Sequence, residues 1–519
     1  MATPTVEAYR DVLGHLDEEQ VKKLLAFPKP AKAWPYAFPA ERDLAGLRAA
    51  IEAKYQPGEK GDGEGVKRHK VAGRLRAKRL AGGIAFLVLE GERASIQAIL
   101  QKDEMGEAFD QALHLVSEGD WVGVAGYPMR SKRGEPSIGA EKVELLAKAL
   151  VPFPDLRTAD NPELRYGKPY VNLMQGPAER KVILDRARIT QAVRQTLEKE
   201  GFIEAAIPVL ERVYGGANAQ PFTTHSNAKG MTMYLRISHE LALKKLLVGG
   251  IERVYHIGPA FRNEDIDTTH NPEFTLMECY AAFQDYSFMM RMTEGIVRNA
   301  AKAVHGEPLV RVKDPSQPDG VRVLDLGKPF ARVTMKDAIR IHSAGTPEAQ
   351  DLGMPEGIRV DEVTDAQMQA ILDRHRIHIR GGYARGLGIA KLFEHFAEPK
   401  LVEPTFVIDH PRETTPLCKQ HRKDPTLVER FELFLLGREH ANAYSELNDP
   451  FVQASLFAEQ ERRRSAGDEE APPTDQDFIE ALKHAMPPAA GLGIGIDRLV
   501  MTLLGIDSIK QVLPFPQVK

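Results

Sequence analysis

The chain has 519 residues, of which 43% are hydrophobic, 27% charged and 7% aromatic. These proportions are ordinary for globular proteins and exclude a collagen, a continuous coil and a wholly disordered chain. The length predicts two to four domains at roughly 100–200 residues each. The net charge of −4 excludes a chain that coats nucleic acid uniformly, although a local basic patch remains compatible with it.

The cysteines and the first residues bear on the compartment. Only Cys279 and Cys418 occur, which excludes a disulfide framework and a cysteine-based zinc site and favours a reducing compartment. The N-terminal segment MATPTVEAYRDVLG has no basic region followed by an apolar one. No apolar run approaches the roughly 18 residues of a membrane span. We therefore expect a cytoplasmic protein that does not enter a membrane.

Residues 1–60 are expected to form a helical appendage, because two short helical stretches flank the Pro-rich segment PKPAKAWPYAFPAE. The next domain is expected at residues 61–150. Five short β-like segments, VAGRLR, IAFLVLEG, SIQAIL, DWVGVAGYPM and PSIGAEKVELL, are separated there by turn residues such as Gly82 and Gly83. Strands at this spacing predict a small barrel of the OB type over about residues 66–148.

A basic run opens this barrel. The segment VKRHKVAGRLRAKRL, residues 66–80, holds seven Lys and Arg residues and no acid. Barrels of this type bind single-stranded nucleic acid on one strand face. A base could stack on Phe86 in the following strand, a contact worth roughly 1–3 kcal/mol. The alternative, a core Phe86 beside a solvated basic face, fits this stretch equally well.

Residues 151–174 are rich in Pro and polar residues and predict a linker, and residues 175–519 predict an α+β domain. Apolar residues at helical spacing predict a helix from Ala178 to Glu200, which Gly201 ends. The segment FIEAAIPVL predicts a strand with Pro208 at an edge. Further strands are expected near 254–258, 273–283, 404–409, 431–436, 441–447 and 492–496, and an exposed loop at 459–475.

The first of three polar stretches is VYHIGPAFRNEDIDTTHNPEFTLMECYAAF, residues 254–283. A strand leads into a loop that carries Arg262, whose planar fork suits a phosphate. The returning strand places Phe274, Glu278 and Tyr280 on one side. A surface ion-pair hairpin is the alternative, but it does not explain Glu278 inside an apolar strand, where an unpaired carboxylate is costly.

The second stretch is RFELFLLGREHANAYSELNDP, residues 430–450, in which Glu432, Glu439 and Glu446 recur. If two strands meet near Gly437, these carboxylates converge and suit Mg²⁺ with a polyphosphate completing its shell. A spare carboxylate could pair with a substrate ammonium. A helix would instead place the acids on one solvated face, and the spacing alone leaves that alternative open.

The third stretch is GLGIGIDRLVMTLLG, residues 491–505, a Gly-rich strand that enters an amphipathic helix with Asp497 and Arg498 in its first turn. Glycine lets backbone approach a ligand closely. No Gly-Lys-Ser/Thr follows, so the run is not a Walker phosphate loop.

Together the three stretches resemble the motifs of class II aminoacyl-tRNA synthetases. F-R-N-E before an acidic strand is similar to motif 2, G-x-G-x-D-R to motif 3, and the helix and strand ending in Pro208 to motif 1. More narrowly, the chain resembles the lysyl-tRNA synthetase family through GGANAQPF, YLRISHELALKKLLVGGIERVY, FRNEDIDTTHNPEFTLMECY, ANAYSELNDP and GLGIGIDR. One departure is Ser238–His239, where that family usually has Ala-Pro.

The resemblance implies an OB-fold anticodon-binding domain, an antiparallel catalytic sheet flanked by helices, and a homodimer. It implies that L-lysine and ATP form lysyl-adenylate, with Mg²⁺ as cofactor, and that the lysyl group passes to tRNA(Lys). The residues it assigns to ATP are Arg262, Glu264, His270, Phe274 and Arg498, of which Arg262 and Arg498 are catalytic. The residues it assigns to lysine are Gly216, Glu240, Glu278, Tyr280, Asn442, Tyr444 and Glu446. The residues it assigns to the metal are Glu432 and Glu439, and those to the anticodon are Arg79, Phe86, Gln97 and Glu135.

Charge complementarity favours the same substrate. Lysine carries two ammonium groups, and Glu240, Glu278 and Glu446 supply an acidic pocket that an aspartate- or asparagine-specific relative would not need. Such a relative remains an alternative, as does a catalytically silent paralogue that binds tRNA or ATP. An enzyme that lysylates a protein would lack the barrel, and a generic OB-fold binder would not explain the rest of the chain.

Overall fold

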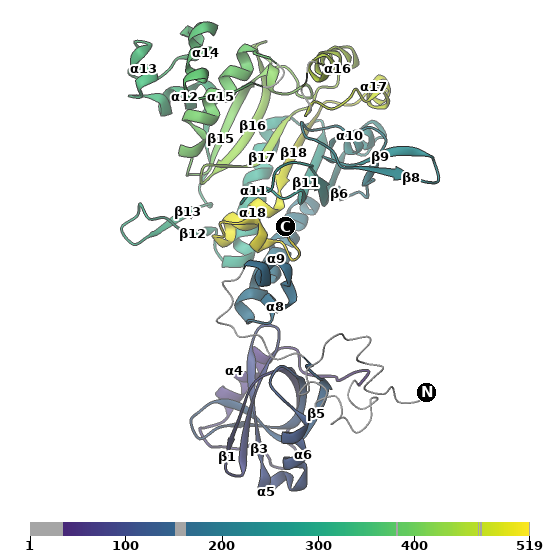
Figure 1. Ribbon diagram of the computed structural model, residues 1–519, viewed down its shortest axis with the longest axis vertical. Helices are drawn as coiled ribbons and strands as arrows, with labels where there is room; N and C mark the ends of the chain where they lie inside the picture. The colour runs from purple at the N-terminus through teal and green to yellow at the C-terminus, as the bar shows by residue number, and fades with distance from the viewer. Residues whose placement is uncertain (1–34, 151–161, 380–381, 466, 468–469, 518–519) are drawn as a thin grey trace. The chain divides into compact units, whose positions relative to one another are not determined.

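The computed structural model describes residues 35–150, 162–379, 382–465, 467 and 470–517 (Figure 1). The chain divides into two compact units, one up to Lys181 and one from Val182 onward. The predicted N-terminal helix before the Pro-rich segment and residues 151–161 of the predicted linker lie outside the described residues. The helix expected after that segment is present as α4 (Leu44–Lys54). Residues 162–173 of the linker form α7 (Pro162–Gly167) and α8 (Pro169–Leu173).

The first unit contains a closed five-stranded barrel with the order β1-β2-β3-β5-β4. Its strands are β1 (His69–Ala81), β2 (Ile84–Glu90), β3 (Ser95–Gln101), β4 (Trp121–Arg130) and β5 (Pro136–Ala147). Alternate residues such as Val71, Leu87 and Ile96 fill its interior, and Leu44 and Ile51 of α4 pack against the same core. The barrel that the strand spacing predicted is therefore confirmed.

Two helices between β3 and β4 were not predicted. They are α5 (Lys102–Met105) and α6 (Glu107–Leu115). Only Phe109 and Ala112 of α6 are buried, and both join the barrel core. A helix of nine residues with two buried positions carries too little periodicity to be recognised in the sequence.

The second unit is built on an eight-stranded sheet with the order β14-β15-β16-β17-β18-β11-β10-β6. Pairing is antiparallel except at β14–β15 and β10–β6, which agrees with the predicted α+β class. The strands are β6 (Ile203–Glu204), β10 (Arg253–Phe261), β11 (Glu273–Ala282), β14 (Ala331–Thr334), β15 (Thr405–Pro411), β16 (Leu427–Leu435), β17 (Arg438–Ser445) and β18 (Ala489–Gly495).

Helices bury one face of this sheet. They are α9 (Pro177–Lys199), α11 (Tyr286–His305) and α18 (Ile496–Leu504). Their apolar stripes pack on Met277 and Cys279 of β11 and Ala441 and Ala443 of β17, and Figure 1 shows α11 and α18 against these strands. The intervening residues of the same strands face the other way, because side chains alternate along a strand. The candidate site lies on that second face.

Other elements surround the sheet. A small sheet contains β7 (Leu210–Glu211), β8 (Thr223–Ser226) and β9 (Met231–Leu235), and β12 (Leu309–Lys313) pairs with β13 (Val321–Asp325). The remaining α-helices are α10 (Glu240–Val248), α12 (Met335–Ser343), α13 (Pro347–Asp351), α14 (Asp365–Arg374), α15 (Arg385–Phe396), α16 (Pro450–Ser465), α17 (Gln476–Lys483) and α19 (Ile509–Val512). No helix among the described residues is both long and apolar enough to cross a membrane.

Several local predictions can be compared with the structure. β16 and β17 form a hairpin around Gly437, so the helical alternative for 430–450 is wrong. The strand expected over FIEAAIPVL is paired with the sheet only as β6, at an edge. The prediction of a loop at 459–475 is wrong for residues 459–465, because α16 extends to Ser465. Ion pairs one turn apart, Glu459–Arg462 and Glu461–Arg464, support that part of the helix.

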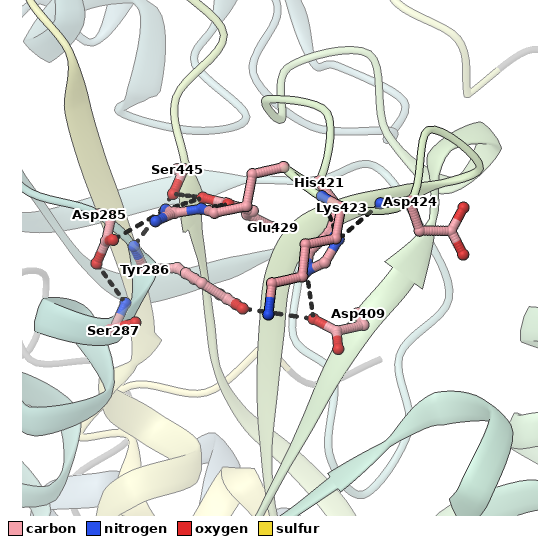
Figure 2. Close-up of polar contacts among 10 residues, drawn as sticks. Asp285, Tyr286, Ser287, Asp409, His421, Lys423, Asp424, Glu429 and Ser445 are labelled. Carbon is pink, nitrogen blue, oxygen red and sulfur yellow. Dashed lines mark hydrogen bonds and ion pairs between the residues drawn. The ribbon is translucent and has the colours of Figure 1, made fainter.

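A polar network anchors the loop that leads into β16 (Figure 2). Arg422 forms ion pairs with Glu429 of β16 and with Asp285, the N-cap of α11. Glu429 accepts a hydrogen bond of 2.7 Å from the hydroxyl of Ser445 on β17, and Ser445 accepts one of 3.2 Å from the backbone N–H of Tyr286. The network joins the loop, the helix and two strands. Residues 414–417 of the same connection line the cavity described next.

Candidate active site

A cavity of about 490 Å³ opens on this second face of the sheet, part of which is covered by α10, α16 and α17. Its lining comes from β11, β16, β17 and β18, the start of α10 and α18, and the connections around them. Of the fourteen residues that the resemblance assigned to ATP, lysine and metal, only Glu446 is absent from the lining. The thirteen that line the cavity are Gly216, Glu240, Arg262, Glu264, His270, Phe274, Glu278, Tyr280, Glu432, Glu439, Asn442, Tyr444 and Arg498.

The cationic part of the lining begins at Arg262, which follows β10. Its guanidinium lies 5.2 Å from the centroid of the Phe274 ring on β11, a cation–π contact. Its Nε donates to the carbonyl of Ile237 at 3.4 Å. The side chain is thereby held against an aromatic surface within the cavity. A planar base stacked on Phe274 would lie next to a cation that can bind a phosphate oxygen pair.

A second cation, Arg498, stands in the first turn of α18. Its Nη2 donates to Nε2 of His270 at 2.8 Å, and its Nη1 donates to the backbone carbonyl of Glu439 at 3.2 Å. The other ring nitrogen of His270 bonds Asp267 at 2.7 Å. These hydrogen bonds join residues that are far apart in the sequence along the cationic part of the lining, here called the cationic wall.

Glu432 of β16 and Glu439 of β17 form an acidic pair in the same lining. Burial raises the pKa of both, and the pKa of Glu439 is raised further by Glu432. Arg430 donates to Glu432 at 2.5 Å. Two mutually repelling carboxylates fit a Mg²⁺ ion whose other ligands are phosphates and water. Among the residues that the structure describes, no cluster of three or more acidic, His or Cys side chains could hold a metal by itself.

The acidic part of the cavity is built around α10. Glu240, its first residue, accepts hydrogen bonds from Lys244 one turn later and, at 2.7 Å, from the hydroxyl of Tyr444 on β17. Gly216 faces it with φ of +84°. A Cβ at Gly216 would overlap the Ser238 hydroxyl, so this position requires glycine for both its backbone conformation and its close approach.

Glu278 on β11 is the second acid of this part. Its carboxylate accepts a hydrogen bond of 3.0 Å from the backbone N–H of His239 and one of 2.9 Å from the hydroxyl of Tyr280. Burial, together with repulsion from Glu240, raises its pKa to about 7. Where the resembled family usually has proline, this chain has His239, and proline could not donate that backbone hydrogen bond.

Glu446, after β17, lies behind the lining and is 0% exposed. Its Oε2 forms an ion pair with Lys244. Its Oε1 has no hydrogen-bond partner among the residues that the structure describes. A Cβ at Gly491 of β18, which does line the cavity, would overlap Glu446 and the Tyr280 ring. Glycine at this position therefore lets the acid and the ring pack directly against β18.

The residues assigned to the anticodon lie on the barrel. Arg79, Phe86 and Ile99 are successive partners across β1, β2 and β3. Phe86 is half-buried against a cluster of Ile99, Tyr127 and Met129, which is separate from the barrel core. Phe86 is therefore not part of the main barrel core but packs on this smaller cluster. Its ring belongs to the outer face of the barrel.

The other two assigned residues of the barrel already have polar partners. Gln97 donates to the hydroxyl of Ser137 at 3.0 Å. Glu135 pairs with Arg48 at 2.7 Å, with 45% of its side chain exposed. Arg68, from the basic run, lies 5.7 Å from the Tyr127 ring. Aromatic and basic side chains thus share a face suited to stacking bases and neutralising phosphates.

Sequence reasoning assigned no role to three residues that support the site. Lys244 pairs with two of the assigned acids, and Arg430 bonds both Glu432 and Asn442. Asp497 accepts from the backbone N–H of Thr275 at 2.6 Å and pairs with Arg186. Spacing held a signal for two of them, since Lys244 follows Glu240 by one helical turn and Arg430 shares a strand face with Glu432.

Comparison with known families agrees with this geometry. The model for class II tRNA synthetases of the D, K and N type matches residues 161–519, and the model for the OB-fold nucleic acid binding domain matches residues 69–146. The first match covers more than half of the chain. The fold and site therefore define a class II tRNA synthetase with an OB-fold domain, as the resemblance implied.

Comparison with curated relatives identifies the family within this class. A lysine–tRNA ligase of Enterococcus faecalis is 42% identical over 450 residues, which is 86% of each chain. One of Thermosynechococcus vestitus is 42% identical over 488 residues, 93% of this chain and 92% of the relative. One of Synechococcus is 40% identical over 505 residues, which is 97% of this chain and 99% of the relative. The chain belongs to the lysine–tRNA ligase family.

Proposed function

We propose that the chain activates L-lysine with ATP to lysyl-adenylate and transfers the lysyl group to the 3′ end of tRNA(Lys). The observation that carries this proposal is one cavity lined both by Arg262 and Arg498 and by the buried acids Glu240 and Glu278. The cations suit the phosphates of ATP, and the acids suit the two ammonium groups of lysine. The test, exchange of pyrophosphate into ATP, is described at the end of the Discussion.

The chain's own residues supply orientation and charge rather than a nucleophile. Joining a carboxylate to a phosphate requires that both negative charges be neutralised and the reacting atoms aligned. We propose that Arg262 binds the α-phosphate, that Phe274 stacks on adenine with Glu264 at its edge, and that His270 and Arg498 hold the outer phosphates. Glu432 and Glu439 would hold Mg²⁺, which supplies further neutralisation of phosphate charge when bound.

At the acidic part, we propose that lysine lies against Gly216, Glu240, Glu278, Tyr280, Asn442, Tyr444 and Glu446. Glu240 and Glu278 line the cavity and each already accepts from a tyrosine hydroxyl. The unpartnered Oε1 of Glu446 is a further acceptor for an ammonium, because a buried acceptor without a partner is costly. We also propose a homodimer, a cytoplasmic location, and domains at 1–60, 61–150, 151–174 and 175–519.

The same residues argue against the two alternative functions. An aspartate- or asparagine-specific enzyme would place a neutral or negative side chain against Glu240 and Glu278, which costs binding energy. A silent paralogue would have no need to keep Arg262, Arg498 and the Glu432–Glu439 pair in one cavity.

The barrel is expected to act on tRNA alone. Phe86→Ala should raise KM for tRNA(Lys) by about fivefold to a hundredfold, since a base–aromatic stack is worth roughly 1–3 kcal/mol. Adenylate formation without tRNA should be unchanged. Aminoacylation and pyrophosphate exchange measured on the same preparation check this, with Phe451→Ala, an exposed aromatic of the second unit, as the control. Loss of exchange in Phe86→Ala would contradict the separation of roles.

Lysine use should depend on the ionisation of Glu278. Burial raises its pKa to about 7, and only the carboxylate attracts an ammonium. The value of kcat/KM for lysine, which reports ionisations of the free enzyme, should therefore fall as pH drops below about 7. Glu278→Gln should remove this inflection. Burial and Arg236 lower the pKa of nearby His239 to about 3, so that histidine does not titrate in the same range. An inflection retained in Glu278→Gln would contradict the assignment.

A further inference from the structure

Lys244 is a buried cation beside the acidic part of the cavity. It is 0% exposed and is absent from the cavity lining. Its ammonium forms ion pairs with Glu240 and Glu446. Its Nζ also lies 5.5–6.0 Å from the centroids of three aromatic rings, those of Tyr280, Tyr444 and Phe478. Two of these rings, with both acids, belong to the set proposed to hold lysine.

The surroundings keep this ammonium charged. Burial alone would lower the pKa of Lys244, but the carboxylates of Glu240 and Glu446 outweigh burial and raise it above its ordinary value. An ammonium removed from water is costly unless it is paired, and removing one partner of a buried pair is strongly destabilising. Lys244 is therefore a permanent internal counter-ion of the acidic part.

The charges around this part can be counted from the side chains that meet there. Glu240, Glu278 and Glu446 contribute three carboxylates, and Lys244 contributes one ammonium. When all are ionised, two net negative charges remain. Arg236, another buried cation nearby, donates to the backbone carbonyls of Pro259, Ile207 and Pro208 and is not among the residues that line the cavity. Lysine brings two ammonium groups, which match these two negative charges.

We propose that Lys244 determines amino-acid specificity by acting through Glu240 and Glu446: it neutralises one carboxylate, so that the pocket matches a substrate with two ammonium groups. This inference rests on the proposed function. Norleucine, whose side chain has the four carbons of lysine but no ε-ammonium, would leave one carboxylate unneutralised. Removing a single negative charge from the pocket should make it match norleucine better, and removing Lys244 in addition should reverse that change.

The test compares kcat/KM for lysine with kcat/KM for norleucine in pyrophosphate exchange. The proteins are wild type, Glu446→Gln, the double variant Lys244→Met/Glu446→Gln, and Lys244→Arg. The lysine-to-norleucine ratio should fall at least about tenfold in Glu446→Gln and recover by about tenfold in the double variant, where two net negative charges are restored. Lys244→Arg, which keeps the charge, should keep a ratio close to that of wild type. KM for ATP should change by less than about threefold throughout.

A purely structural role for Lys244 predicts a different pattern. It would lower activity with both amino acids together and leave their ratio in the double variant equal to that in Glu446→Gln, or below it. That result would overturn the inference. If the double variant does not fold, the same ratio in Lys244→Arg decides, and a fall of about tenfold there would contradict the charge argument. Absence of lysine-dependent exchange in wild type would instead contradict the proposed function itself.

Discussion

Arg262→Ala is expected to lower lysine-dependent pyrophosphate exchange by at least about a hundredfold, because removing one preorganised donor at a developing charge typically costs about 10²–10³ in rate. Arg262 is held against Phe274 within the cavity, so no reorientation is needed when a phosphate arrives. Lysine binding measured by calorimetry without ATP should change far less than exchange.

The matched control is Arg311→Ala. Arg311 lies on β12, outside the cavity, where it forms a surface ion pair with Glu307 at 3.1 Å. Such pairs contribute little to stability, and exchange should stay within about twofold of wild type. Full exchange in Arg262→Ala would remove the role assigned to this residue and to the cationic wall around it.

Glu446→Gln is expected to raise KM for lysine by about a hundredfold while KM for ATP changes by less than about threefold. The carboxylate is fully buried, and losing a charged partner in a buried ion pair costs about 2–5 kcal/mol. A glutamine has nearly the same shape, so the change is mainly one of charge. Initial-rate exchange with each substrate varied in turn measures both constants.

Glu480→Gln provides the control for that change. Glu480 lies on α17 and pairs with Lys483 on the surface, so neither KM should move. Equal increases in KM for lysine and for ATP in Glu446→Gln would contradict its assignment to the amino-acid part of the cavity. They would indicate a general loss of structure behind β17 and β18.

The parts of the fold that the sequence predicted are those with strong local patterns. The helix ending at Gly201 is long and periodic, and Phe274, Glu278 and Tyr280 alternate along one strand, so both were recognised. The hairpin at Gly437 was left open between strands and a helix. The reason is that acids seven residues apart satisfy helical spacing, and only pairing with β15 and β18 decides between the two.

What the sequence did not reveal depends on contacts between distant segments. In the sequence, Lys244 looks like an ordinary helix residue, because its partner Glu446 follows β17, far along the chain. In the same way, Arg498 and His270 form a hydrogen bond although they are 228 residues apart. The helix through Ser465 was missed because a run of charged residues looks like a loop, although its ion pairs one turn apart stabilise it.

The most direct test of the account is amino-acid-dependent exchange of pyrophosphate into ATP by the whole chain without tRNA. Four reactions are compared: lysine, aspartate, asparagine and no amino acid. The cavity predicts exchange with lysine alone, because Glu240, Glu278 and Glu446 leave a negative pocket for its two ammonium groups. Exchange with aspartate or asparagine would contradict the acidic-pocket argument. Absence of exchange with every amino acid would contradict the proposal that the chain activates an amino acid with ATP.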